Sequence, residues 1–190
     1  MKEIISEKEI FTGVDYSGQT LSDREFESCE FINCNFSKSN LSNSDFLNCK
    51  FMNCNFSMAN FNNTGLKDVK FTDCKLMGID FTRCNNFLLS FSFDKCYLNF
   101  STFHRKKIKN TIFKDCSIKE VDFSETDLTA SGFLNCDLAR SIFNRTVLEK
   151  VDFRTAYNYS IDPELNRIKK AKFSQFGVAG LLDKYQISIE

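Results

Sequence analysis

Residues 26–61 read FESCEFINCNFSKSNLSNSDFLNCKFMNCNFSMANF, with a large hydrophobic residue at every fifth position. The series continues in both directions without a miss, from Phe11 to Phe81. A second series with the same period runs from Phe93 to Phe153. A period of five fits neither the 3.6-residue repeat of a helix nor the two-residue alternation of a flat strand. It indicates a repeat architecture, which has to be recognised before any local assignment.

The residue two positions before the large one is small in most repeats, as in Cys29, Ser39 and Ala59. Side chains two apart on an extended chain point to the same side, so both positions are predicted to face the interior. The other three positions are mostly polar and suit turns and solvent. An extended segment that turns every five residues closes into a square after four segments, which makes one coil. About eight such coils, each rising about 4.8 Å, predict an all-β rod roughly 38 Å long.

The cysteine spacing supports a coil of four segments. A spacing of 20 residues occurs in two runs of cysteines, namely Cys34, Cys54, Cys74 and Cys96, Cys116, Cys136. The gap between the two runs is 22 residues, and the same two-residue slip separates the two hydrophobic series. Residues 82–92 are therefore predicted to form a bulge or short loop in one continuous solenoid. All six cysteines should then lie in one ladder on one face.

The sequence divides into three parts. Residues 11–173 are predicted to form the solenoid, with an irregular last coil over residues 157–172. Residues 1–10 are expected to cap its first coil. Residues 174–190 should form a short helix followed by a terminal strand over 186–190. Covers are expected because an open coil exposes unpaired backbone groups.

Composition limits the broad class. The chain has 190 residues, 25 basic and 25 acidic, which suits one domain of zero formal charge. Residues 1–81 carry 8 Lys/Arg and 12 Asp/Glu (net −4), and residues 82–190 carry 17 and 13 (net +4). No apolar run approaches 18 residues, and the N-terminal stretch is too charged for a signal peptide. We therefore expect a cytoplasmic protein without membrane association.

No pattern in the sequence predicts catalysis or a cofactor. All nine cysteines occupy the small inward position, where stacked thiols would lie about 4.8 Å apart, against about 2.05 Å in a disulfide. There is no CxxC spacing and no histidine partner, so packing is favoured over a metal site. The single histidine, His104, begins the basic run 104–109, which is interpreted as a solvated edge with no direct binding of nucleic acid. Neither a glycine-rich phosphate loop nor a nucleophile elbow is present.

The repeat resembles that of the pentapeptide-repeat proteins. It stands here as SNLSNSDFLNCKFMNCNFSMANF (39–61) and as VDFSETDLTASGFLNCDL (121–138), and the likeness extends over residues 11–173. The resemblance implies an all-β fold, the right-handed quadrilateral β-helix of that family. Most members of the family have no assigned function.

A narrower resemblance lies near the C-terminus, where IDPELNRIKKAKF (161–173) precedes GVAGLLDKYQISI (177–189). This arrangement is similar to the subgroup that contains the microcin immunity protein and the quinolone-resistance proteins. Members of that subgroup dimerise through their C-terminal ends and act on DNA gyrase. The resemblance implies a homodimer with an interface formed by Phe176, Val178, Leu181, Leu182, Tyr185, Ile187 and Ile189.

Two functions remain open at this point. The first is a rod-shaped, DNA-mimic-like dimer that binds DNA gyrase or topoisomerase IV and protects it from a quinolone-type or microcin-type inhibitor. The second is a scaffold or adaptor for a different protein. Its candidate partner surface consists of four aromatic residues expected to be exposed, Tyr97, Phe100, Tyr157 and Tyr159. The alternative is an asparagine-rich face with Asn40, Asn43, Asn60, Asn62 and Asn63. The near-neutral charge and the absence of long loops distinguish this chain from the resistance proteins.

Overall fold

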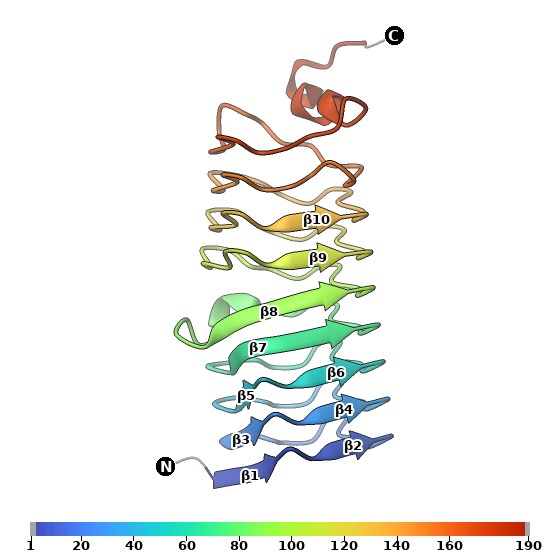
Figure 1. The fold of residues 1–190 in the computed structure, drawn as a ribbon, viewed down its shortest axis with the longest axis vertical. Coiled ribbons are helices and arrows are strands. Elements are labelled where there is room, and N and C mark those ends of the chain that lie inside the picture. Colours follow the sequence, from blue (N-terminus) through green and yellow to red (C-terminus); the bar gives the residue numbers. More distant parts are fainter. Residues whose placement is uncertain (1–2, 189–190) are drawn as a thin grey trace.

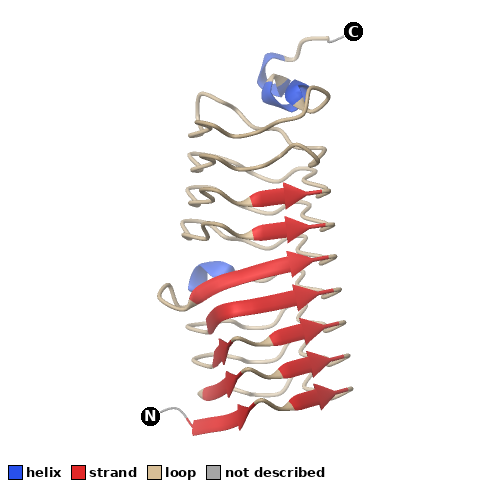
Figure 2. Cartoon of the chain, in the orientation of Figure 1, coloured by secondary structure: helices blue, strands red, loops and turns tan. Residues whose placement is uncertain are grey.

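The computed structural model describes residues 3–188 and shows one rod of stacked coils with the two termini at opposite ends (Figure 1). All strand pairs are parallel. The strands are short and lie in the lower coils of the view, while the last coils carry none (Figure 2). The strands are β1 Glu3–Glu7, β2 Ile10–Thr12, β3 Arg24–Glu27, β4 Glu30–Ile32, β5 Asp45–Leu47, β6 Lys50–Met52, β7 Gly65–Thr72, β8 Leu89–Asp94, β9 Ile112–Lys114 and β10 Gly132–Leu134.

The polar positions of the repeat build the corners of each coil. Asn43, Asn48 and Asn53 have φ of 60°, 52° and 53°, a left-handed conformation that asparagine tolerates better than most residues. The residue just before each large one closes the same turn, since Asn35 Oδ1 accepts a hydrogen bond from the N–H of Ser37 at 3.1 Å. The five-residue period therefore fixes both the inward side chains and the turns between them.

The phenylalanine rings stack in columns along the rod. Nine rings, one on each level, stack with centroids 4.7–5.3 Å apart. Phe113 and Phe133 are 4.8 Å apart with planes inclined by 1°. A second column has Phe123 stacked at 5.3 Å on both Phe103 and Phe143. Rings of the two columns meet edge-on, so aromatic contacts fill the interior in both directions.

The nine cysteines are buried and free, as the packing interpretation predicts. Eight of the nine thiols donate weak hydrogen bonds to carbonyls of the coil below, as Cys54 does to Phe31 at 3.4 Å. Within the predicted ladder, the backbone N–H of Cys96 donates to Cys116 Sγ at 3.4 Å. Burial raises the pKa of the Cys49 thiol to about 12. The cysteines therefore serve as small rungs of the core.

The slip between the two series is a bulge anchored by a buried lysine. Phe71 pairs with Phe93, a step of 22, and the register shifts just before this pair. The 3₁₀ helix η1, Phe81–Arg83, leads into the bulge. Lys106 is buried against the bulge on the next coil, and its Nζ donates to the carbonyl of Cys84 at 2.8 Å and to Asn86 Oδ1 at 2.5 Å. The expectation that Lys106 belongs to an exposed basic edge is thus wrong, because it occupies a small inward position where the inserted residues leave room.

At the N-terminal end, residues 3–7 form β1, which pairs with β3 and extends the ladder by one rung. The expected C-terminal helix is two short 3₁₀ helices, η2 (Val178–Leu181) and η3 (Asp183–Tyr185). The terminal strand expected over 186–190 is not formed by residues 186–188, and the last two residues lie outside the described range.

The C-terminal segment packs closely on the last coil. The N–H of Ile161 donates to the carbonyl of Gly180 at 2.9 Å. A Cβ at Gly180 would lie 2.2 Å from the carbonyl oxygen of Tyr159, and one at Gly177 would lie 2.3 Å from its hydroxyl oxygen. These two glycines are therefore required for the close approach of backbone to the Tyr159 ring. Leu181 packs against the core from the same segment.

Candidate functional site

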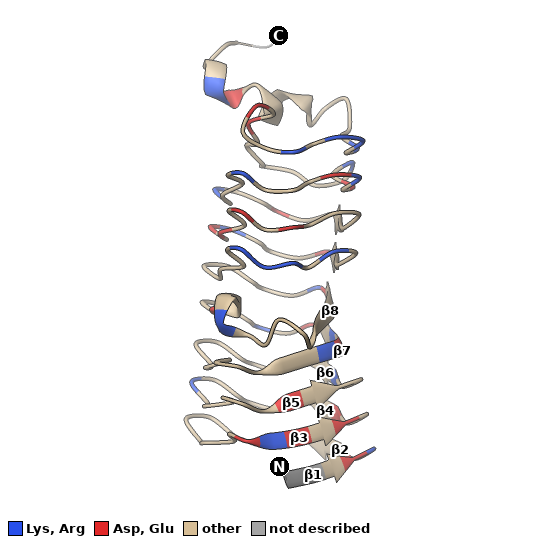
Figure 3. Ribbon diagram, turned by 90° about the vertical axis from the view of Figure 1, so that its left-hand side faces the viewer, with Lys and Arg blue, Asp and Glu red and all other residues tan. Residues whose placement is uncertain are grey.

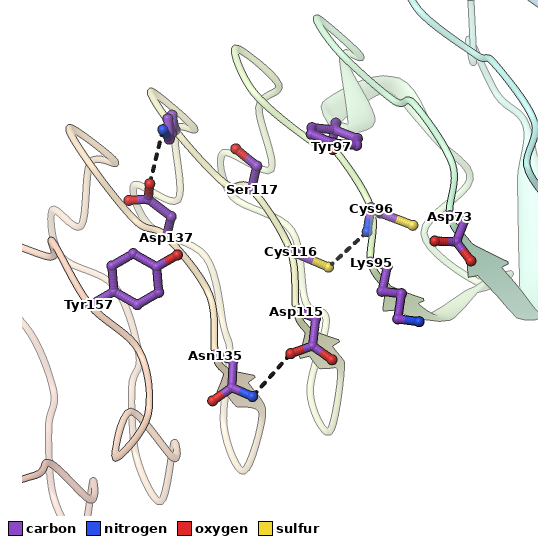
Figure 4. Close-up of a pocket in the computed structure, with 11 residues that line it drawn as sticks. Asp73, Lys95, Cys96, Tyr97, Asp115, Cys116, Ser117, Asn135, Asp137 and Tyr157 are labelled. Carbon is purple, nitrogen blue, oxygen red and sulfur yellow. Dashed lines mark hydrogen bonds and ion pairs between the residues drawn. The ribbon is translucent and has the colours of Figure 1, made fainter.

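Two exposed tyrosines stand at the ends of a shallow hollow on one face of the rod (Figure 4). Tyr97 and Tyr157 are 50% and 48% exposed. They belong to one column of paired residues, with Ser117 and Asp137 on the two coils between them. Three coil steps of about 4.8 Å place the tyrosines roughly 14 Å apart along the rod. The hollow has a volume of about 520 Å³.

The polar groups of the hollow are held in place by neighbouring coils. Asp137 accepts a hydrogen bond from Asn158 Nδ2 at 2.9 Å and forms an ion pair with Lys119 at 3.0 Å. Burial acts to raise the pKa of Asp137, but these partners outweigh it and lower the pKa. On the adjacent corner Asn135 Nδ2 donates to Asp115 Oδ1 at 3.0 Å. The hollow is thus a fixed surface with aromatic ends and a polar middle.

The structure brings together only part of the predicted partner surface. Phe100 is exposed on the corner that follows Tyr97 on the same side of the coil. Tyr159 is only 4% exposed, so its assignment to an exposed surface is wrong. Its ring packs on Phe153 and Phe173 at the top of the core. The irregular phase at Asn158 turns Tyr159 inward, where the five-residue pattern alone would place it outside.

Charges on the surface pair between coils. Figure 3 shows basic and acidic segments alternating on successive coils of the C-terminal half. Seven ion pairs join residues of neighbouring coils: Lys50–Glu30, Arg105–Glu125, Lys109–Asp127, Lys114–Asp94, Lys119–Asp137, Arg140–Glu120 and Arg167–Glu149. Exposed pairs of this kind contribute little to stability, but they neutralise the face on which they lie. Unbalanced negative charge is concentrated at the N-terminal end, where residues 3–30 carry two basic and eight acidic side chains, a net charge of −6.

The C-terminal segment has an inner and an outer side. Leu181 packs inward, whereas Phe176 is 96% exposed. Val178, Tyr185 and Ile187 are exposed as well, and Leu182 is half-buried. Ile189 of the predicted interface lies outside the described residues. The outer side is thus an apolar patch at one end of the rod.

Between residues 3 and 188, no group of three or more His, Cys, Asp or Glu side chains could hold a metal ion. Within the same range no helix has the length and apolar character needed to cross a membrane.

Comparison with known proteins gives one family and one group of structures. The family profile described as the pentapeptide repeat region matches residues 24–91 and 85–155. A trypsin-treated variant of QnrB1, a plasmid-mediated fluoroquinolone resistance protein, superposes with a TM-score of 0.72 at 14% identity, covering 99% of this chain and 100% of that chain. Full-length QnrB1 gives a TM-score of 0.62 at 15% identity, covering 96% and 100%. No curated protein matches the sequence.

Proposed function

Since the chain belongs to the pentapeptide-repeat family, we propose that it is a non-enzymatic interaction protein that binds DNA gyrase or a related type II topoisomerase and protects it from an inhibitor. The observation that carries this proposal is the end-to-end likeness to QnrB1, a fluoroquinolone resistance protein, over the whole length of both chains. The likeness includes the C-terminal segment and not only the repeats, which any member of the family would share.

The proposed active form is a homodimer through the C-terminal patch. Gly177 and Gly180 dock the inner side of the segment onto its own solenoid, so the segment caps the rod. The outer side, with Phe176 and Ile187, remains available for a second copy. An exposed apolar patch on an otherwise polar protein is a common mark of an interface. Two rods end to end would span roughly 75 Å, the length of about 20 base pairs at 3.4 Å each.

Shape rather than uniform charge supports docking of this rod on a surface that normally binds DNA. The ion pairs between coils leave no continuous negative stripe in the C-terminal half. A positively charged DNA-binding surface would be attracted chiefly by the acidic N-terminal end. In a C-terminal dimer the two acidic ends would lie farthest from the dimer axis.

The proposal is tested with purified gyrase. DNA supercoiling is measured with and without a fluoroquinolone while the protein is titrated in. Recovery of supercoiling in the presence of drug, at protein concentrations that do not inhibit gyrase alone, is the expected result. No recovery at tens of micromolar protein would reject the proposal for this class of inhibitor, and a parallel titration against a peptide toxin of the microcin type covers the other class.

The dimer is tested separately by light scattering. The double variant Phe176→Ser, Ile187→Ser removes two exposed apolar side chains from the patch and is expected to be monomeric. The matched control is Phe87→Ser, since Phe87 is 95% exposed on the bulge, far from the C-terminus. A wild-type protein that is monomeric at all concentrations would exclude the dimer.

A second candidate function is that of an adaptor using the hollow between Tyr97 and Tyr157. Two half-exposed tyrosines on a rigid face are typical anchors of a protein contact. The double variant Tyr97→Ser, Tyr157→Ser should abolish binding of such a partner without changing stability. If the same variant retains full protection of gyrase, the hollow is not the topoisomerase contact.

A further inference from the structure

Among residues 3–188, the side of β2 that faces the N-terminal end of the rod pairs with no other strand. In each coil the residue before the large one directs both backbone groups downward: Asn35 donates to the carbonyl of Val14 at 3.0 Å and accepts from the N–H of Tyr16 at 2.7 Å. Ile10 and Asp15 hold the same position in the first coil, so their N–H and C=O groups point toward the open end, where the carbonyl of Asp15 accepts a hydrogen bond from Gln19 Nε2 at 2.7 Å. Within the described residues β2 is an edge strand, paired only with β4.

The aromatic core is also incompletely covered at this end. Phe11 stacks on Phe31 at 4.7 Å, and Tyr16 stacks on Phe36 at 4.9 Å. Phe31 and Phe36 are fully buried, whereas Phe11 and Tyr16 are only half-buried. Each ring of the first coil therefore has one face against the core and the other toward the end of the rod. At the C-terminal end the corresponding place is covered by η2 and the segment around it.

The edge is surrounded by carboxylates. Glu9 and Asp15 are exposed beside β2, and Glu7 precedes it, paired with Lys8 at 2.8 Å. The net charge of −6 over residues 3–30 opposes pairing of this end with the same end of another copy. Charged residues at a sheet edge commonly prevent such self-association. They do not oppose a strand that carries positive charge.

We propose that the N-terminal end of the solenoid is a docking site for an extended basic segment of another protein, which adds a parallel or antiparallel strand to β2. Backbone hydrogen bonds to Ile10 and Thr12 would supply the pairing, as in other cases of strand addition. One apolar side chain of the added strand would cover the open face of Phe11. The flanking Lys or Arg side chains would lie near the carboxylates of Glu7, Glu9 and Asp15, which surround this end of the rod. The segment therefore alternates basic and apolar residues.

The probe is a seven-residue peptide, acetyl-KVKVKVK-amide, compared with acetyl-EVEVEVE-amide. Binding to the full chain is followed by amide chemical shifts at 0.15 M salt. The lysine peptide is expected to shift the amides of residues 9–16 and to leave the C-terminal half unchanged. A lysine peptide that is N-methylated at every residue cannot donate a backbone hydrogen bond from either edge, and it should lose binding.

The charge contribution is tested with Glu9→Gln and Asp15→Asn. Each is expected to weaken binding of the lysine peptide about two- to fivefold, the change that corresponds to about 0.4–1 kcal/mol for an exposed ion pair. Asp73→Asn, an exposed carboxylate on a corner in the middle of the rod, is the matched control and should bind as wild type.

Three results would overturn the proposal. These are equal binding of the lysine and glutamate peptides, shifts centred elsewhere than residues 9–16, and no binding at millimolar peptide. Concentration-dependent shifts of the same amides without any peptide would assign the edge to a second copy of this chain and would overturn it as well.

Discussion

Gly180→Ala is the most informative single change, because two physical effects predict opposite signs. Alanine favours helical backbone over glycine, so without a steric contact the variant would be more stable by up to about 1 kcal/mol. In this structure the added Cβ would lie 2.2 Å from the carbonyl oxygen of Tyr159 and 2.9 Å from its ring. Neither the backbone oxygen nor the buried ring can move aside, so the C-terminal segment has to shift away from the last coil.

The magnitude follows from what that shift disrupts. Overpacking of a tight contact costs about 1–3 kcal/mol, and the hydrogen bond from Ile161 to Gly180 contributes about 1 kcal/mol more. We expect the docked segment to lose about 2–4 kcal/mol, which corresponds to opening that is about 30- to 900-fold more frequent. The solenoid itself should remain folded because its coils do not depend on this contact.

Hydrogen exchange of residues 174–188 measures the opening directly, and urea denaturation reports the solenoid. Gly18→Ala is the control, since a Cβ there meets nothing within 4 Å and only the φ of +65° opposes it. That variant should cost about 1–2 kcal/mol and leave exchange at the C-terminus unchanged. Slower exchange at residues 174–188 in Gly180→Ala than in wild type would refute the contact.

Three further predictions concern the core and the bulge. Phe123→Ala should lower the free energy of unfolding by about 3–5 kcal/mol, because the ring is fully buried. Phe100 is exposed, so Phe100→Ala should change the free energy of unfolding by less than about 0.5 kcal/mol. Equal effects of the two substitutions in urea denaturation would contradict the stacked core. Lys106→Met should destabilise the protein, because it leaves two oxygens of the bulge without their donor. Burial lowers the pKa of Lys106, so between the folded pKa and the ordinary value of about 10.4 the unfolded chain binds more protons than the folded one. The contribution of Lys106 to the free energy of unfolding therefore rises with pH across that window. Lys106→Met should remove this rise from the pH profile of unfolding. Burial raises the pKa of Cys49 and Cys84 to about 12, so their thiols should resist alkylation at pH 8 until denaturant is added, and rapid labelling of the native protein would contradict their burial.

The sequence predicts both the family and the coil, because every coil repeats the same pattern of residue types. A large residue at one position, a small one two before it and turn-forming residues between them determine the inside, the outside and the corner independently in each segment. The 22-residue step between Cys74 and Cys96 even located the bulge. The buried lysine that anchors the bulge was missed, although Lys106 occupies a position that is small in most other repeats.

Beyond the last regular coil, the five-residue pattern no longer predicts which side chains face inward. Tyr159 was expected outside but lies under η2, because Asn158 breaks the phase and the glycines at 177 and 180 let backbone approach the ring. The hollow forms because Tyr97 and Tyr157, 60 residues apart in the chain, lie in one column. The repeat period predicts this column, but it does not predict how exposed the two tyrosines are.

The sequence by itself determined the solenoid, since the residue types within each five-residue segment determine which side chains face inward. Tertiary structure alone decided the ends and the surface charge. Which ring stays half-covered, which glycine touches a tyrosine and which lysine meets a carboxylate depend on contacts between coils, and these arise only after the chain has wound.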